Sequence, residues 1–219
     1  MEELARTIIA RYFLASGETI TEAMEGRAAV VVTTTAARWA VEPYTGFPHL
    51  AGNGAYRLFD VTPATFSNPR PPRGVCVGAD GPLWLLSDPD DLRRWYAAAK
   101  PPLDPLELAG LLVRYHGTGG SGHTLIAQMD DLGGLLAPEQ IAALPAFTLP
   151  AIETPSPGAF AMAFCSLFLA RGEADRVWRV NLNRWHVAAA VDEQLAWSLT
   201  AIARELDSPR YAPQWLHTE

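Results

Sequence analysis

The spacing of apolar and polar positions changes several times along the chain, and each spacing predicts a different element. Within residues 2–16, apolar side chains recur at the helical period from Leu4 to Ala15, behind two glutamates, so we expect a helix. Residues 28–35 read AAVVVTTT, a β-branched run that is typical of a strand. The run YRLFDV at 56–61 predicts a further short strand.

Turn signals and two Asp-Pro pairs organise the middle of the chain. Short apolar runs at Val75–Val77 and Leu83–Leu86 flank an Ala-Asp-Gly turn, which predicts a β-hairpin. Asp88 and Asp104 are each followed by proline, and an aspartate N-cap with proline at the first helical position favours a helix start. We therefore expect two helices here, the second ending near His116.

The C-terminal part predicts a long hairpin followed by a helix. Residues 159–170 are apolar at nearly every position, which is typical of a strand that is covered on both faces. Residues 177–187 mix apolar and polar positions, as in a strand with one wet face. After Asp192, four apolar residues fall three or four positions apart and predict a helix with one buried stripe: Leu195, Leu199, Ile202 and Leu206.

This order of elements predicts an α+β fold class. We expect a mostly antiparallel sheet covered by helices, in a single domain of residues 1–219, because no strand–helix–strand alternation suggests a parallel sheet. The proline-rich loop 63–74 is a possible sub-boundary. The residues before it are few for an independent core, so a long surface loop is favoured.

Composition limits the classes of function. The net charge is −7 and the basic residues are scattered, whereas nucleic-acid binding needs clustered cations, so no nucleic-acid partner is expected. Charged residues interrupt the N-terminal segment, and the longest apolar run is about half of a membrane span, so we expect a cytoplasmic protein without membrane contact. Lys100 is the single lysine beside many arginines and alanines, which is associated with GC-rich bacterial coding.

The glycine-rich loop 117–122 is the first candidate for chemistry. Its backbone amides could hold an anion, but it follows a helix and lacks the Gly-Lys-Ser/Thr ending of nucleotide loops. A flexible connection is favoured, and a small-ligand site in this loop stays an alternative. His116 and His123 straddle the loop and are not held on one helical face, so neither a metal nor another cofactor is expected.

A Cys/His-dependent hydrolase is a second alternative. Cys76 and Cys165 are too few for a disulfide framework, and His116 precedes Cys165 by about 50 residues, a separation that also occurs in caspases. The segment LLVRYHGTG around His116 resembles the His-Gly segment of caspase-like peptidases over about ten residues. The resemblance implies a dyad of His116 and Cys165. However, Cys165 lacks a Gln-Ala-Cys-type signature and continues an apolar strand, as a buried structural cysteine would.

Aromatic and arginine side chains give the favoured hypothesis, which is binding. One group falls on the half-polar strand: Trp178, Arg179, Arg184 and Trp185. A second group falls in the proline-flanked loop 43–49: Tyr44, Phe47 and His49. Exposed Trp and Arg mark protein–protein interfaces, but for the strand group the alternative, that the tryptophans pack under helices and the arginines are solvated, is slightly favoured. Aromatic side chains in a loop require cover from the core, a partner or a ligand. We therefore expect a non-catalytic component that binds a protein partner or associates with itself.

Overall fold

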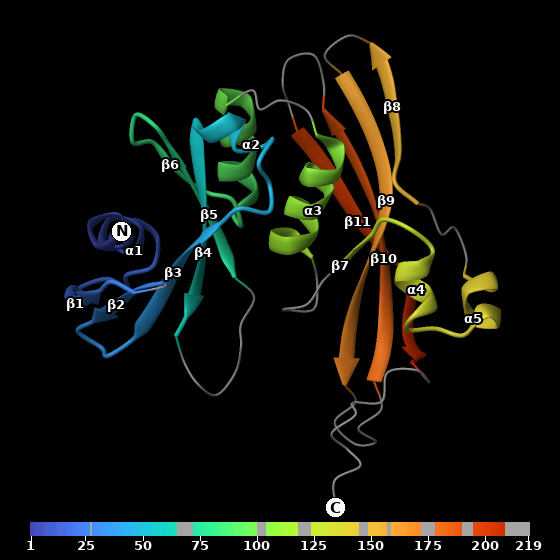
Figure 1. Cartoon of the computed structure of the whole chain (residues 1–219), viewed down its shortest axis with the longest axis horizontal. Coiled ribbons are helices and arrows are strands. Elements are labelled where there is room, and N and C mark those ends of the chain that lie inside the picture. Colours follow the sequence, from blue (N-terminus) through green and yellow to red (C-terminus); the bar gives the residue numbers. More distant parts are fainter. Residues whose placement is uncertain are drawn as a thin grey trace, which may run out of the picture. The chain divides into compact units, whose positions relative to one another are not determined.

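A computed structural model shows a chain of two compact units, residues 1–121 and 122–219 (Figure 1). The structure describes residues 1–26, 28–64, 72–99, 104–117, 124–144, 149–156, 159–171, 178–189 and 195–208. The division between the units falls outside the proline-rich loop 63–74, most of which lies outside the described residues. Each unit contains one antiparallel sheet.

The first unit is built on a six-stranded antiparallel meander in which each strand pairs with the next along the chain. Its strands are β1 (Ile20–Met24), β2 (Ala29–Thr33), β3 (Arg38–Tyr44), β4 (Tyr56–Pro63), β5 (Arg73–Gly78) and β6 (Leu83–Leu85). The predicted hairpin is confirmed, because Val77 of β5 pairs with Leu83 of β6. The β-branched run at 28–35 is also a strand, β2, whereas β1 was not predicted.

The helices of the first unit are α1 (Glu2–Tyr12), α2 (Pro89–Ala99) and α3 (Pro105–His116), with a short 3₁₀ turn, η1 (Gly52–Gly54). Both Asp-Pro helix starts are confirmed. Asp104 accepts hydrogen bonds from the amides of Leu106 and Glu107, and Asp88 does the same for Asp90 and Asp91. Ile8 and Ile9 of α1 are fully buried in a cluster with the apolar face of the sheet.

The second unit is a five-stranded antiparallel sheet with two short helices. Its strands run in the order β11–β10–β9–β7, with β8 pairing beside β9. Their bounds are β7 (Thr124–Ile126), β8 (Ala151–Ser156), β9 (Ala159–Arg171), β10 (Trp178–Ala189) and β11 (Leu195–Asp207), and the helices are α4 (Asp130–Gly133) and α5 (Pro138–Ala142). The long hairpin is confirmed as β9 and β10, which pair without interruption along their length.

The helix expected after Asp192 is wrong, because this segment forms β11. The burial alternates between Leu195 and Thr200, as in a strand, and β11 pairs with β10. Arg184 pairs with Thr200, but Leu182 pairs with Ala203, so one extra residue is inserted near Ile202. Beyond this β-bulge, the apolar residues on one face change from odd to even positions. The step from Leu199 to Ile202 is therefore three residues long, as it would be in a helix.

The α+β expectation with antiparallel pairing therefore holds, although the strands form two sheets instead of one. That helices cover the sheets, and that the two units form one domain, stay predictions. None of the helices in the described part of the chain is long and apolar enough to cross a membrane.

Candidate functional site

One face of α3 receives the aromatic loop. Asp104, Glu107, Gly110 and Arg114 follow each other at steps of three, three and four residues, so they lie on one side of the helix. The loop 44–50, which begins at Tyr44, the last residue of β3, contacts this side at successive levels. These contacts lie within the first unit.

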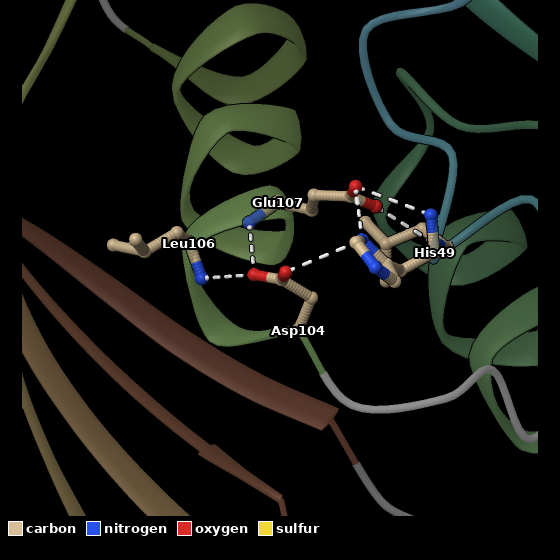
Figure 2. A network of polar contacts seen from close by, with 5 residues as sticks. His49, Asp104, Leu106 and Glu107 are labelled. Atoms are coloured by element: carbon tan, nitrogen blue, oxygen red, sulfur yellow. Dashed lines mark hydrogen bonds and ion pairs between the residues drawn. The ribbon is translucent and has the colours of Figure 1, made fainter.

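The first contact joins His49 to Glu107, as Figure 2 shows. The Nδ1 atom of His49 lies 2.8 Å from Oε1 of Glu107. The same carboxylate accepts the backbone amides of His49 at 3.1 Å and of Leu50 at 2.8 Å. The side chain of Glu107 is only 11% exposed, so its charge depends on these three donors in place of water.

Asp104 supports the same imidazole from the end of the helix. Its Oδ2 atom lies 3.4 Å from Nδ1 of His49, while its Oδ1 atom caps α3. The hydrogen bond to Glu107, the charge of Glu107 and the charge of Asp104 together raise the pKa of His49 above its usual value. The imidazolium form therefore predominates over a wider pH range than in a free histidine.

The second contact places Phe47 against Gly110. Phe47 is almost completely buried, and a Cβ atom at position 110 would lie 3.0 Å from its Cε1 atom. Any residue other than glycine would therefore press on the ring. Helix α3 of the same unit therefore supplies the cover that this aromatic side chain needs.

The third contact holds Tyr44 under Arg114. The guanidinium carbon lies 4.3 Å from the centre of the Tyr44 ring, a cation–π geometry. Arg114 also donates to both carboxylate oxygens of Asp60 on β4, which fixes the guanidinium over the ring. The ring centroids of Tyr44 and Phe47 are 4.9 Å apart, so the two side chains also pack against each other and link the second contact to the third.

Tyr115 completes the polar cluster beneath Arg114. Its hydroxyl donates to Oδ1 of Asp60 at 2.7 Å. Its ring lies where a Cβ atom of Gly74 would be, and Gly74 is the cross-strand neighbour of Asp60. Burial, with the Asp60 carboxylate next in importance, raises the pKa of Tyr115 well above its usual range, so the phenol stays protonated and donates.

The three contacts align the loop antiparallel to α3: Tyr44 meets Arg114, Phe47 meets Gly110, and His49 meets Glu107 and Asp104. Beside the loop is a cleft of about 420 Å³. Its walls are mostly aromatic, aliphatic and proline side chains: Met1, Pro43, Tyr44, Phe47, Pro48, Ala51, Tyr56, Leu58 and Phe59. The arrangement can hold an apolar group against a surface that is already ordered.

The trio of His49, Asp104 and Glu107 also has a donor set that a divalent metal ion could use, with ligand atoms within 4.8 Å of one another. The hydrogen bonds do not favour this use. Glu107 already receives two backbone amides, and Nδ1 of His49 faces two acceptors, as expected when it carries a proton. An ion pair that anchors the loop explains the geometry fully.

The two residues of the alternative dyad, His116 and Cys165, lie in different units, and each has contacts within its own unit that a purely structural role explains. His116 lies at the end of α3, where its Nε2–H donates to the carbonyl of Leu86 at 2.7 Å. Burial lowers the pKa of His116, which favours the neutral ring. Cys165 of β9 is fully buried in an apolar cluster with Ile126 and Leu132, and nucleophilic thiols need access to substrate. The pairing of His116 with Cys165 stays a hypothesis.

The four residues predicted on the half-polar strand fall on both faces of β10. Trp185 is fully buried, stacks on Phe164 at 5.6 Å and donates its indole N–H to Ser166. This burial is evidence against a surface binding role for Trp185. Trp178, Arg179 and Arg184 are half-buried on the same strand. The glycine-rich loop is outside the described residues from position 118 onward, as is His123.

Sequence reasoning found the loop but missed its supports on α3. Glu107 and Arg114 are two turns apart in a helix whose other residues are mainly apolar, with Gly110 between them. A polar pair at this spacing, with glycine between, indicates a helix face that receives another segment. Asp60 gave no comparable signal, since its role depends on the pairing of β4 with β5.

Comparison of the chain with protein families, curated proteins and solved structures finds no match.

Proposed function

We propose that this chain is a non-catalytic binding protein whose cleft beside the loop 44–50 takes an apolar segment of a partner protein. The observation that carries the proposal is the anchoring of this loop at three levels of α3. An aromatic wall that is ordered before binding loses less conformational entropy on association than a mobile loop would.

The chemistry of the cleft supports an apolar occupant. Its volume of about 420 Å³ lies within the ~300–1,000 Å³ range of ligand clefts. Among the described residues that line it, Arg57 is the one with a charged side chain, and the aromatic and proline side chains favour contact with aliphatic or aromatic groups. Anchors of this kind, an apolar side chain in an apolar pocket, contribute most of the free energy of protein–protein association.

The test is selection of displayed random peptides on the wild-type chain, followed by measurement of each enriched peptide against two variants. Ala51→Leu adds bulk at a residue that lines the cleft without removing any of its walls. Ala98→Leu adds the same bulk at an exposed position of α2. We expect enriched peptides with aromatic or aliphatic anchors, tenfold or more weaker binding to Ala51→Leu, and unchanged binding to Ala98→Leu.

Two results would contradict the proposal. One is the absence of any enriched peptide that binds the wild type. The other is equal binding of the enriched peptides to wild type and Ala51→Leu, provided that circular dichroism shows both to be folded. A cytoplasmic location in a bacterial cell fits this proposal and is part of it.

A further inference from the structure

We infer that the second unit binds a small, singly charged carboxylate with a flat apolar body, on the face of the sheet formed by β8, β9, β10 and β11. A cavity of about 600 Å³ lies on this face. Arg184, His186 and Glu153 line it together with short side chains. This site is separate from the cleft of the first unit.

Strand register explains why the face is hollow. Ala151, Ala163, His186 and Ser198 are cross-strand neighbours in one row. Glu153, Ala161, Ala188 and Ala196 form the next row. Cross-strand neighbours lie on the same face of a sheet, so alanine methyl groups form most of the floor. Such a floor is flat and apolar, which suits a planar apolar group.

Arg184 gives the hollow a cation with an unused donor. It is two residues before His186 on β10 and therefore lies on the same face. Its cross-strand neighbour is Cys165, a member of the buried apolar cluster of this unit. The Nε atom of Arg184 is buried and has no hydrogen-bond partner within the part of the chain that the structure describes.

A buried donor without an acceptor costs free energy, and a carboxylate in the cavity would supply the acceptor once the guanidinium turns its Nε–H towards it. Arginine also matches the planar geometry of a carboxylate, with two parallel N–H···O bonds. The ligand that this geometry fits has its carboxylate at Arg184 and its apolar body on the alanine floor.

Glu153 limits the ligand to one negative charge. It lines the cavity from β8, which is separated from the strand of Arg184 by β9. A second anionic group at that end of the cavity would be repelled by the carboxylate of Glu153. A dicarboxylate that spans the floor is therefore disfavoured relative to a monocarboxylate.

The experiment compares naphthoate with its uncharged amide, naphthamide, by isothermal titration calorimetry on the full chain. The two probes have the same ring system and differ in charge. We expect naphthoate to bind at least tenfold more tightly to the wild type, because charge-assisted hydrogen bonds are stronger than neutral ones. In Arg184→Gln, we expect the two dissociation constants to become equal.

Arg179→Gln is the matched control on the same strand. Arg179 lies on the opposite face of β10, where its Nε atom is 3.4 Å from Asp207, so the preference for naphthoate should persist. Ala163→Leu fills the floor and should weaken both probes by tenfold or more. Near-ultraviolet circular dichroism checks that each variant is folded.

The inference is overturned if naphthoate does not bind the wild type at millimolar concentration. It is also overturned if folded Arg184→Gln keeps the preference, or if folded Ala163→Leu binds both probes as the wild type does.

Discussion

The Nδ1 atom of His49 lies 2.8 Å from Oε1 of Glu107, and the same carboxylate accepts the amides of His49 and Leu50. One side chain of α3 thus fixes both the backbone and the side chain of the loop. Together with the Phe47–Gly110 and Tyr44–Arg114 contacts, these hydrogen bonds hold the loop against α3 along its length.

The charge of His49 should depend on Glu107. Because the pKa of His49 is raised in the fold, its contact with Glu107 contributes fully below the usual pKa of about 6.5 and is lost as the pH rises through the higher folded value. In Glu107→Gln, we expect the pKa of His49 to fall towards its usual value. Titration of the imidazole protons by NMR measures both values, and identical titration curves would contradict the assignment.

Asp60 should be required for the polar cluster beneath Tyr44. Asp60→Asn removes the charge that faces Arg114 and weakens the bond from the Tyr115 hydroxyl. Because the Arg114 side chain is still 33% exposed, we expect a modest loss of about 1–2 kcal/mol in the free energy of unfolding. Urea denaturation measures this loss.

Asp80→Asn serves as its control, since Asp80 is exposed in the turn between β5 and β6. It should change the free energy of unfolding by less than about 0.5 kcal/mol. Equal effects of the two substitutions would show that the cluster at Asp60 contributes nothing specific.

Replacement of Gly110 by alanine should not stabilise the protein, although such a replacement usually does so in a helix. In an exposed helix interior, Gly→Ala stabilises by about 1 kcal/mol. At Gly110 the added Cβ atom would press on Phe47, so we expect Gly110→Ala to gain nothing and Gly110→Val to lose about 1–3 kcal/mol by thermal or urea unfolding. A clear stabilisation by both substitutions would mean that the loop does not pack there.

Both cysteines should be inert in the folded protein. Cys76 and Cys165 are both buried, so a reagent does not reach either sulfur in the folded protein. Burial also raises the pKa of Cys76 to about 12, so that thiol stays protonated near neutral pH. We expect iodoacetamide to modify neither residue under native conditions and both after unfolding, as mass spectrometry would show. Rapid native modification of Cys165 would revive the dyad hypothesis.

Local signals predicted the elements with specific chemistry at their ends. The Asp-Pro pairs at Asp88 and Asp104 marked α2 and α3, because the cap and the first turn are encoded by adjacent residues. The turn before Leu83 marked the β5–β6 hairpin for the same reason. Strand β8 was missed because its pairing with β9 is a tertiary property, while Pro155 within it and the prolines on either side indicate an irregular connection.

The β11 segment shows how a period can mislead. A step of four residues, as between Leu195 and Leu199, fits one face of a helix and also one face of a strand. The next step, of three residues to Ile202, fits only a helix, and it is the reason why a helix was predicted. That step arises at the β-bulge, which depends on pairing with β10. The spacing alone could not distinguish the two origins.

The candidate site was predicted in part. Tyr44, Phe47 and His49 were selected as aromatic groups that need cover, but the residues that contact them, on α3 and at its N-cap, come 55 to 70 positions later in the chain. Trp185 was grouped with Arg179 and Arg184 as a possible interface, and it lies in the core. The sequence could not decide this, because alternate residues of a strand face opposite sides and the burial of each side depends on packing.

Hydrogen–deuterium exchange at the amides of His49 and Leu50 tests most directly whether α3 holds the loop. Both amides donate to Glu107, so we predict that they are protected in the wild type and exchange at least tenfold faster in Glu107→Ala. The control Glu3→Ala, at an exposed position of α1, should leave their exchange unchanged. Exchange of these two amides at the unprotected rate in the wild type, or equal rates in wild type and Glu107→Ala, would contradict the account.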